Sequence, residues 1–245
     1  MQNDVAHSNK LMVKRFLRRR GLVAVADKSS ATHLAQYNLT PDVVFDVGVD
    51  TGTPFLYDAF AQAKFVLIDP RAESRAAMTG LQDACFVQTA LGAREGRMTL
   101  HIPHNAAGEL GARASLHLPT GPMAEKITAM TTREVPVSTL DTVAGQFPGR
   151  VGLKIDVEGA EAEVLAGAKQ TLRRCDFVIL ELSLTQRFEQ TPMPSQIFAA
   201  LAAAGLEFRD VLRSTGDGKG GPAPRLMDIL FTRWPTAARP NTIPA

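Results

Sequence analysis

The fold of this chain is decided by the stretch Leu153-Lys154-Ile155-Asp156-Val157-Glu158-Gly159-Ala160-Glu161. The apolar run over 151–157 is interrupted by a lysine and an aspartate, and it ends in an acidic turn that contains a glycine. Apolar residues then recur at helical spacing, at Val164, Leu165, Ala168 and Leu172. We therefore predict a buried strand over 151–156 that delivers charged side chains to the start of a helix over 160–173. Open α/β sheets carry their chemistry at such carboxyl ends of strands.

Strand-like and helix-like segments alternate on both sides of this stretch. We expect buried strands over 43–47, 64–69, 84–88, 151–156 and 177–182. We expect helices over 55–63, 71–80, 160–173 and 196–204. Strands that alternate with helices in this way form right-handed βαβ units and a parallel sheet.

Two further strands are expected near the C-terminal end, over 206–212 and 226–232. The Gly/Pro-rich loop between them has no room for a crossover helix, so the two strands should be antiparallel. A mostly parallel, seven-stranded sheet that ends in an antiparallel hairpin is typical of the Rossmann-like class I methyltransferases. We therefore predict this α/β fold.

The sequence divides into three parts. We expect a helical cap over 1–40, a main domain over 41–234, and a poorly ordered, Pro-containing tail over 235–245. Within the main domain, residues at about 103–133 form an insertion between extra strands over 97–102 and 134–140, and long insertions commonly cover binding sites. The basic run over 14–20 is interpreted as a solvated helix face, with an anionic membrane surface or a nucleic acid as the alternative.

Composition narrows the function classes. The 245 residues include 27 Lys and Arg against 25 Asp and Glu, so the formal net charge is only +2. This balance argues against a nucleic-acid partner. No apolar run is long enough for a membrane span, and no secretory signal is recognisable. The two cysteines, Cys85 and Cys175, suit a reducing compartment, and we expect a cytoplasmic protein, for which a homodimer is compatible with the sequence.

The turn that follows the strand over 43–47 is the first candidate site. It contains Asp46, Gly48, Asp50 and Gly52. The glycines allow a ligand to approach the backbone closely, but the spacing of a phosphate-binding GxGxxG loop is absent. The two carboxylates would repel a pyrophosphate and would tolerate a sulfonium and an amino group. This favours S-adenosylmethionine over a nicotinamide dinucleotide, with an ordinary helix-capping turn as the alternative.

Asp69 ends the next strand, about twenty residues further on. An acidic residue at this position accepts hydrogen bonds from ribose hydroxyls in nucleoside-binding folds, and a helix N-cap ahead of Pro70 is the alternative. Gln88 and Thr89 follow the third strand, where a contact to the adenine edge would lie. We therefore predict that the ends of these strands form a nucleoside-cofactor site.

Asp156 ends the strand over 151–156, beside the position expected for the transferred group. Its carboxylate can accept the proton of a substrate hydroxyl, or it can bind a divalent cation, which the sequence allows but does not predict. Lys154 and Glu158 lie two residues away on either side, so they should point the same way. Glu161 is interpreted as a complement to the positive start of the next helix. Glu181 ends the strand over 177–182 and should face the same cleft, with an ion pair as the alternative.

Three histidines, His101, His104 and His117, lie in or near the insertion. Their spacing matches no standard zinc pattern, so we predict no metal site there. Ser115 and His117 are instead candidate contacts to the substrate.

The opening stretch, with Val164-Leu165-Ala166-Gly167-Ala168 and Ile179-Leu180-Glu181, resembles the FkbM methyltransferases. The likeness extends to Ala114-Ser115-Leu116 and Val137-Ser138-Thr139-Leu140-Asp141, and it covers about residues 40–185. It implies an S-adenosylmethionine-dependent O-methyltransferase acting on a hydroxyl of a sugar, a glycolipid or a secondary metabolite. The chain departs from the family at Val49-Asp50, where Ala-Asn is usual, and at Asp69, where Glu is usual.

The altered turn at Asp50 motivates an alternative of a different class, a catalytically silent binding or scaffold protein that has kept the fold. An oxidoreductase is disfavoured because the glycine turn is acidic and lacks GxGxxG. A nucleic-acid methyltransferase is disfavoured because the charge is balanced and a base-binding Pro-Pro-Tyr motif is absent. We therefore expect a small-molecule or glycan acceptor.

Overall fold

The computed structural model describes residue 12 and residues 15–20, 28–215 and 225–234. Of the predicted cap, residues 15–19 are helical, and α2 (Ala31–Leu34) and the 3-10 helix η1 (Ala35–Tyr37) follow. Residues 1–11, 13–14 and 21–27 of the cap, which include the first residue of the basic run, and the predicted tail lie outside the described residues. No helix in the described part of the chain has the length and apolar character needed to cross a membrane.

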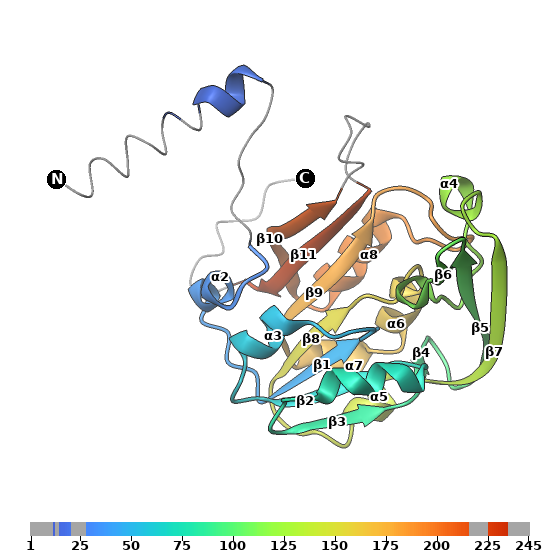
Figure 1. Ribbon diagram of the computed structural model, residues 1–245. Helices are drawn as coiled ribbons and strands as arrows, with labels where there is room; N and C mark the ends of the chain where they lie inside the picture. Colours follow the sequence, from blue (N-terminus) through green and yellow to red (C-terminus); the bar gives the residue numbers. More distant parts are fainter. Residues whose placement is uncertain (1–11, 13–14, 21–27, 216–224, 235–245) are drawn as a thin grey trace, which may run out of the picture.

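The centre of the fold is a seven-stranded sheet (Figure 1). Its strands are, in spatial order, β10 (Leu206–Thr215), β11 (Leu226–Arg233), β9 (Cys175–Ser183), β8 (Val151–Ile155), β1 (Val43–Val47), β2 (Lys64–Ile68) and β3 (Ala84–Val87). β11 runs antiparallel to both of its neighbours, and the other pairs are parallel. The predicted sheet and its C-terminal hairpin are confirmed.

Helices cover both faces of this sheet. One face packs against α5 (Leu140–Ala144), α6 (Glu161–Ala166), α7 (Lys169–Arg173) and α8 (Pro194–Ala203). The other packs against α2, η1, α3 (Pro54–Ala59) and the 3-10 helix η2 (Ala72–Met78). The sequence of β1 is mostly apolar because both faces of the strand are buried. Phe45 packs in the first core and Val44 packs in the second.

The helix predicted over 160–173 is divided into α6 and α7. The break lies at Gly167, where a Cβ atom would come within 2.2 Å of the carbonyl oxygen of Gly92. The carboxylate of Asp141 accepts hydrogen bonds from the backbone N–H groups of Gln170 and Thr171, at 3.0 and 2.8 Å. A side chain from α5 thus satisfies the unpaired donors at the start of a new helix. The predicted helix over 71–80 is likewise replaced by the shorter η2.

A second, four-stranded sheet lies beside the carboxyl ends of the main sheet (Figure 1). It comprises β4 (Ala90–Leu91), β7 (Ala129–Ser138), β5 (Gly96–Asn105) and β6 (Gly108–Glu109). β5 and β7 contain most of the two predicted extra strands and extend into the predicted insertion. The 3-10 helix η3 (Gly111–Arg113) and α4 (Gly121–Ala124) lie between β6 and β7.

Candidate active site

A cavity of about 480 Å³ opens where the carboxyl ends of the parallel strands meet. Strand order reverses between β1 and β8, and open α/β sheets bind ligands at such switch points. The cavity is lined by the turns after β1, β2, β3 and β8, by residues of β9, β10 and β11, and by the stretch 111–116 of the insertion. The site is therefore assembled from both sheets.

The turn after β1 packs directly against the backbone that follows β8. Gly48 has φ +77°, and a Cβ atom there would lie 1.8 Å from the carbonyl oxygen of Asp156. Asp50 and Gly52 also have positive φ, at +45° and +100°. Glycine at position 48 is required both by the left-handed backbone and by the lack of space.

Asp46 is fully buried and is not among the residues that line the cavity. The Tyr57 hydroxyl donates to its Oδ2 at 2.6 Å, and Lys154 Nζ lies 3.9 Å from its Oδ1. Burial raises the pKa of Asp46, and the Lys154 ammonium opposes this rise. The structure thus places this predicted cofactor residue behind the site, where it supports Lys154.

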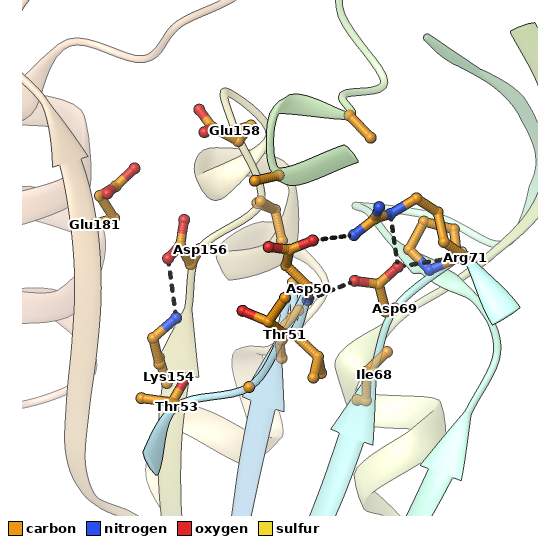
Figure 2. A pocket seen from close by; sticks show the side chains of 18 of the residues that line it. Asp50, Thr51, Thr53, Ile68, Asp69, Arg71, Lys154, Asp156, Glu158 and Glu181 are labelled. Atoms are coloured by element: carbon orange, nitrogen blue, oxygen red, sulfur yellow. Dashed lines mark hydrogen bonds and ion pairs between the residues drawn. The ribbon is translucent and has the colours of Figure 1, made fainter. Parts of the chain in front are cut away.

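Asp69 lies on the wall of the cavity with its carboxylate held by backbone donors (Figure 2). The N–H of Asp50 donates to Oδ2 at 3.1 Å, and the N–H of Arg71 donates to Oδ1 at 2.8 Å. Each carboxylate oxygen retains a second lone pair, so Asp69 can still accept hydroxyl groups of a ribose. Arg71, which the sequence analysis did not single out, also donates from Nη2 to Asp50 Oδ1 at 2.6 Å.

The two predicted adenine contacts have different positions. Thr89 lines the cavity, but its hydroxyl hydrogen-bonds to the carbonyl oxygens of Ala90 and Pro136, each at 3.0 Å. Gln88 is exposed and does not line the cavity. Only Thr89 is therefore close enough to the site to contact a ligand there.

Lys154 and Asp156 lie side by side on the wall of the cavity (Figure 2). Lys154 Nζ donates to Asp156 Oδ2 at 3.0 Å, and the Asp156 side chain keeps 28% of its surface exposed. Burial opposes a charged Lys154, but the carboxylates of Asp156 and Asp46 outweigh it and raise the pKa of the ammonium. The lysine therefore stays protonated and holds the Asp156 carboxylate in place through this ion pair.

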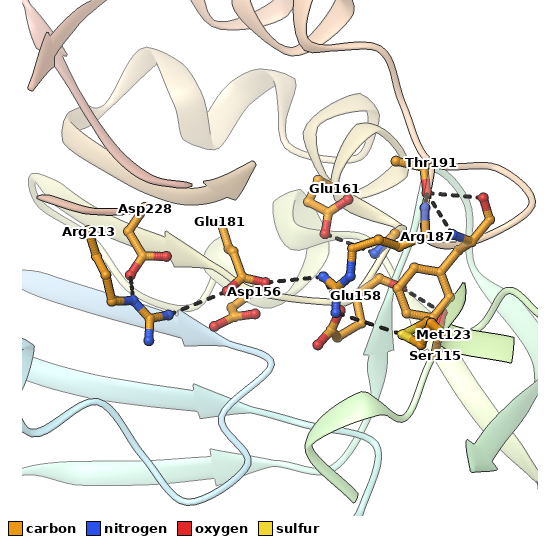
Figure 3. A network of polar contacts seen from close by, with 12 residues as sticks. Ser115, Met123, Asp156, Glu158, Glu161, Glu181, Arg187, Thr191, Arg213 and Asp228 are labelled. Atoms are coloured by element: carbon orange, nitrogen blue, oxygen red, sulfur yellow. Dashed lines mark hydrogen bonds and ion pairs between the residues drawn. The ribbon is translucent and has the colours of Figure 1, made fainter. Parts of the chain in front are cut away.

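Glu158 in the turn after β8 and Glu181 in β9 lie near Asp156, and Arg187 pairs with both glutamates (Figure 3). Arg187 Nη1 lies 2.8 Å from Glu158 Oε2 and 3.6 Å from Glu181 Oε2. Burial raises the pKa of Glu158 to about 7. Burial, with the charges of Asp156 and Glu158, raises the pKa of Glu181 to about 9. Burial and the neighbouring carboxylates therefore favour the neutral form of Glu181, while Arg187 favours the ionised form.

The hairpin of β10 and β11 adds two residues that the sequence analysis missed (Figure 3). Asp228 lies opposite Glu181 in the register of β11 and β9, and both line the cavity. Arg213 donates from Nε to Asp228 at 2.7 Å and from Nη2 to Glu181 at 3.4 Å. Asp228 interrupts an apolar strand, as Asp46 and Asp156 do, and that pattern could have identified it.

The predicted substrate contacts are mostly engaged within the protein. Ser115 lines the cavity, and its hydroxyl donates to the carbonyl oxygen of Glu158 at 2.6 Å. His117 does not line the cavity, and its Nε2 lies 3.1 Å from Glu163 Oε1 on α6. Glu161 begins α6 and accepts a hydrogen bond from the N–H of Gly159 at 2.9 Å. The position of Glu161 agrees with its interpretation as a residue of the helix start.

The residues present fit a nucleoside cofactor. Asp69 supplies a carboxylate for ribose hydroxyls, and Gly48 and Gly52 let the turn run close beside the cavity. The volume lies within the range of small-molecule sites. Among the residues that the structure describes, no group of three or more His, Cys, Asp or Glu side chains is arranged to hold a metal ion.

Sheet order, terminal hairpin and cavity position together define a class I methyltransferase. Residues 46–209 match the Methyltransferase FkbM domain, so the chain belongs to the FkbM family of S-adenosylmethionine-dependent methyltransferases.

One curated protein and one solved structure are similar to this chain. The chain is 28% identical over 199 residues to the 2-O-methyltransferase NoeI of Sinorhizobium fredii, which covers 71% of this chain and 81% of that protein. It superposes on the crystal structure of methyltransferase FkbM from Methylobacillus flagellatus KT with a TM-score of 0.53 at 11% identity. That alignment covers 85% of this chain and 48% of the other, so this chain spans about half the length of that protein. The superposition supports the fold.

Proposed function

We propose that this methyltransferase transfers a methyl group to a hydroxyl of a sugar, a glycolipid or a secondary metabolite, with Asp156 as the general base. The observation that carries the proposal is the position of Asp156, on the cavity wall at the end of β8 with one oxygen held by Lys154. The match to a 2-O-methyltransferase supports an oxygen acceptor.

Cofactor and acceptor are assigned to different parts of the cavity. Asp50, Gly52, Asp69 and Thr89 lie on the side of β1, β2 and β3, where we place the nucleoside of the cofactor. S-adenosylmethionine supplies the electrophilic methyl group. Gly48 shapes the turn between this side and Asp156, because its backbone contacts the Asp156 carbonyl.

The acceptor is assigned to the side of β8, β9 and β11. Asp156 accepts the proton of the acceptor hydroxyl as the oxygen attacks, while Lys154 holds the carboxylate in place. Protonated Glu181 donates a hydrogen bond to a second oxygen of the acceptor, and Glu158 and Ser115 lie at its border. Polar groups on several sides suit an acceptor with more than one hydroxyl, and holding it in line with the methyl group supplies much of the rate acceleration.

Replacing Asp156 by Asn tests this assignment. We expect methyl transfer to fall by about 10²–10⁴-fold because the base is lost, while cofactor affinity stays within a few fold. Turnover is measured with radiolabelled S-adenosylmethionine against sugar and lipid extracts, and affinity is measured by calorimetry. Asp58→Asn on the exposed side of α3 is the matched control.

Two results would contradict the proposal. Normal turnover of Asp156→Asn would show that Asp156 is not the general base. Failure of the wild-type protein to bind S-adenosylmethionine or S-adenosylhomocysteine at millimolar concentration would favour the silent scaffold that the altered turn at Asp50 suggests.

A further inference from the structure

Arg71 joins three segments that meet at the nucleoside side of the cavity. Its Nη2 donates to Asp50 in the turn after β1 at 2.6 Å, and its Nε lies 3.6 Å from Asp69 at the end of β2 (Figure 2). The same Nη2 donates to Ser74 Oγ in η2 at 3.3 Å. The Arg71 side chain is only 9% exposed, although it lines the cavity. A buried guanidinium with this many partners is held in one position.

The two carboxylates on either side of Arg71 need a cation between them. The N–H of Asp50 donates to Asp69 Oδ2 at 3.1 Å, so the turn brings two acidic residues into contact. Both carboxylates also lie within 4 Å of the Arg71 guanidinium, whose positive charge offsets the repulsion between them. Asp50 also has φ +45°, a conformation that residues other than glycine adopt only when their surroundings hold them there. Arg71 supplies both the compensating charge and a bond that holds the turn.

The insertion closes over the guanidinium from the other side. A Cβ atom on Gly111, at the start of η3, would lie 2.0 Å from Arg71 Nη1. Only glycine leaves room for this packing. Arg71 thereby links the turn that faces the cofactor to the insertion that borders the cavity, and both Gly111 and Arg71 line it.

We propose that Arg71 is a positioning residue for S-adenosylmethionine, which acts by holding the carboxylates of Asp50 and Asp69 in the geometry that binds the cofactor. The inference concerns cofactor binding alone and does not depend on the acceptor. It can therefore be tested with purified protein and either S-adenosylmethionine or S-adenosylhomocysteine, and its failure would leave the role of Asp156 untouched.

Arg71→Met is the first test, with calorimetric titration of both ligands. We expect S-adenosylhomocysteine to bind at least tenfold more weakly, because Asp69 is no longer oriented. We expect a smaller loss for S-adenosylmethionine, because two uncompensated carboxylates attract its sulfonium charge. A general loss of structure would weaken both ligands equally, so the ratio of the two dissociation constants identifies the positioning role. Arg75→Met, on the exposed side of η2, is the matched control and should stay within twofold.

Arg71→Lys keeps the charge but lacks the planar fork that reaches two carboxylates. We expect severalfold weaker binding of both ligands with an unchanged free energy of unfolding, which excludes a general loss of structure, and this variant carries the test if Arg71→Met does not fold. The proposal is overturned if Arg71→Met or, where that variant does not fold, Arg71→Lys binds both ligands within twofold of the wild-type protein.

Gly111→Ala gives an independent test, because its methyl group displaces the guanidinium without removing a charge. We expect about fivefold weaker binding of S-adenosylmethionine in the wild-type background. In the Arg71→Met background the methyl group has space, so the same change should have less than a twofold effect. Equal effects in the two backgrounds would show that Gly111 does not act through Arg71 and would overturn the link to the insertion.

Discussion

The two halves of the cavity are held together in different ways. In the nucleoside half, which comprises the turn 48–52, Asp69, Arg71 and Thr89, backbone N–H groups hold the key carboxylate. In the acceptor half, which comprises Lys154, Asp156, Glu158, Glu181, Arg187, Arg213 and Asp228, side chains from different strands and loops hold one another. The first half depends on backbone donors together with the single guanidinium of Arg71, and the second depends on a network of charged side chains.

The two halves also differ in the protonation of their carboxylates. Burial raises the pKa of Glu158 to about 7 and that of Glu181 to about 9. The carboxylates of the acceptor half therefore include groups that gain or lose a proton near neutral pH. Changes to backbone geometry should damage cofactor binding, whereas changes of charge in the acceptor half should appear in the dependence on pH.

Gly48→Ala should give the largest effect, because Gly48 forms the contact between the two halves. A left-handed alanine costs about 1–2 kcal/mol, and its Cβ would meet the carbonyl of Asp156 at 1.8 Å. We expect the free energy of unfolding to fall by more than about 3 kcal/mol, with cofactor binding lost. Chemical denaturation and calorimetry measure the two effects.

Gly80→Ala is the matched control, since Gly80 has φ +90° and a Cβ atom there would meet nothing within 4 Å. This variant should lose only the cost of the left-handed backbone. Equal destabilisation in the two variants would show that close contact with Asp156 is unimportant and would break the structural link between the halves.

The same contrast explains what could be predicted from the sequence. The parallel sheet follows from alternation along the chain, and Asp69 and Asp156 end strands in readable apolar runs, so their place in the cavity was predictable. Arg187 lies in a loop with no periodic pattern, and its partners come from β9 and from the turn after β8. Arg71 depends on contacts with Asp50 and Gly111 that only the folded chain reveals.

Some predictions went wrong for a local reason. The pattern over 160–173 is helical throughout, and nothing in it reveals that Gly167 packs on the backbone of Gly92. Asp46 interrupts an apolar strand, as a residue of the site would. Its carboxylate instead accepts a hydrogen bond from the hydroxyl of Tyr57, which lies on α3. Periodicity indicates which positions are buried, but it does not identify their partners.

Glu181→Gln sharpens the electrostatic side of the comparison. Glu181 keeps its proton up to about pH 9 in the folded protein, whereas a free glutamate loses it near pH 4.5. Between these values the folded state binds more protons than the unfolded state, so the wild-type free energy of unfolding falls as pH rises. Glutamine lacks this dependence. We expect the variant to gain up to about 1.4 kcal/mol per pH unit relative to the wild-type protein between about pH 5 and pH 8.

Denaturation at a series of pH values measures this difference. Glu189→Gln, on the exposed loop that follows β9, is the matched control and should run parallel to the wild-type curve. A parallel curve for Glu181→Gln would mean that Glu181 is ionised in the folded protein. The acceptor half would then not differ from the nucleoside half in the protonation of its carboxylates.

Thr89→Val should give the smallest effect, and it tests how far the nucleoside half extends. The Thr89 hydroxyl bonds to the Ala90 and Pro136 carbonyl oxygens within the protein. Its loss should lower the free energy of unfolding by about 1 kcal/mol and leave affinity for S-adenosylmethionine within about twofold. Thr89→Ser, which keeps the hydroxyl, should retain the stability. If Val weakens cofactor binding tenfold while Ser does not, the hydroxyl contacts the adenine, and the nucleoside half includes a side-chain contact beyond Asp69.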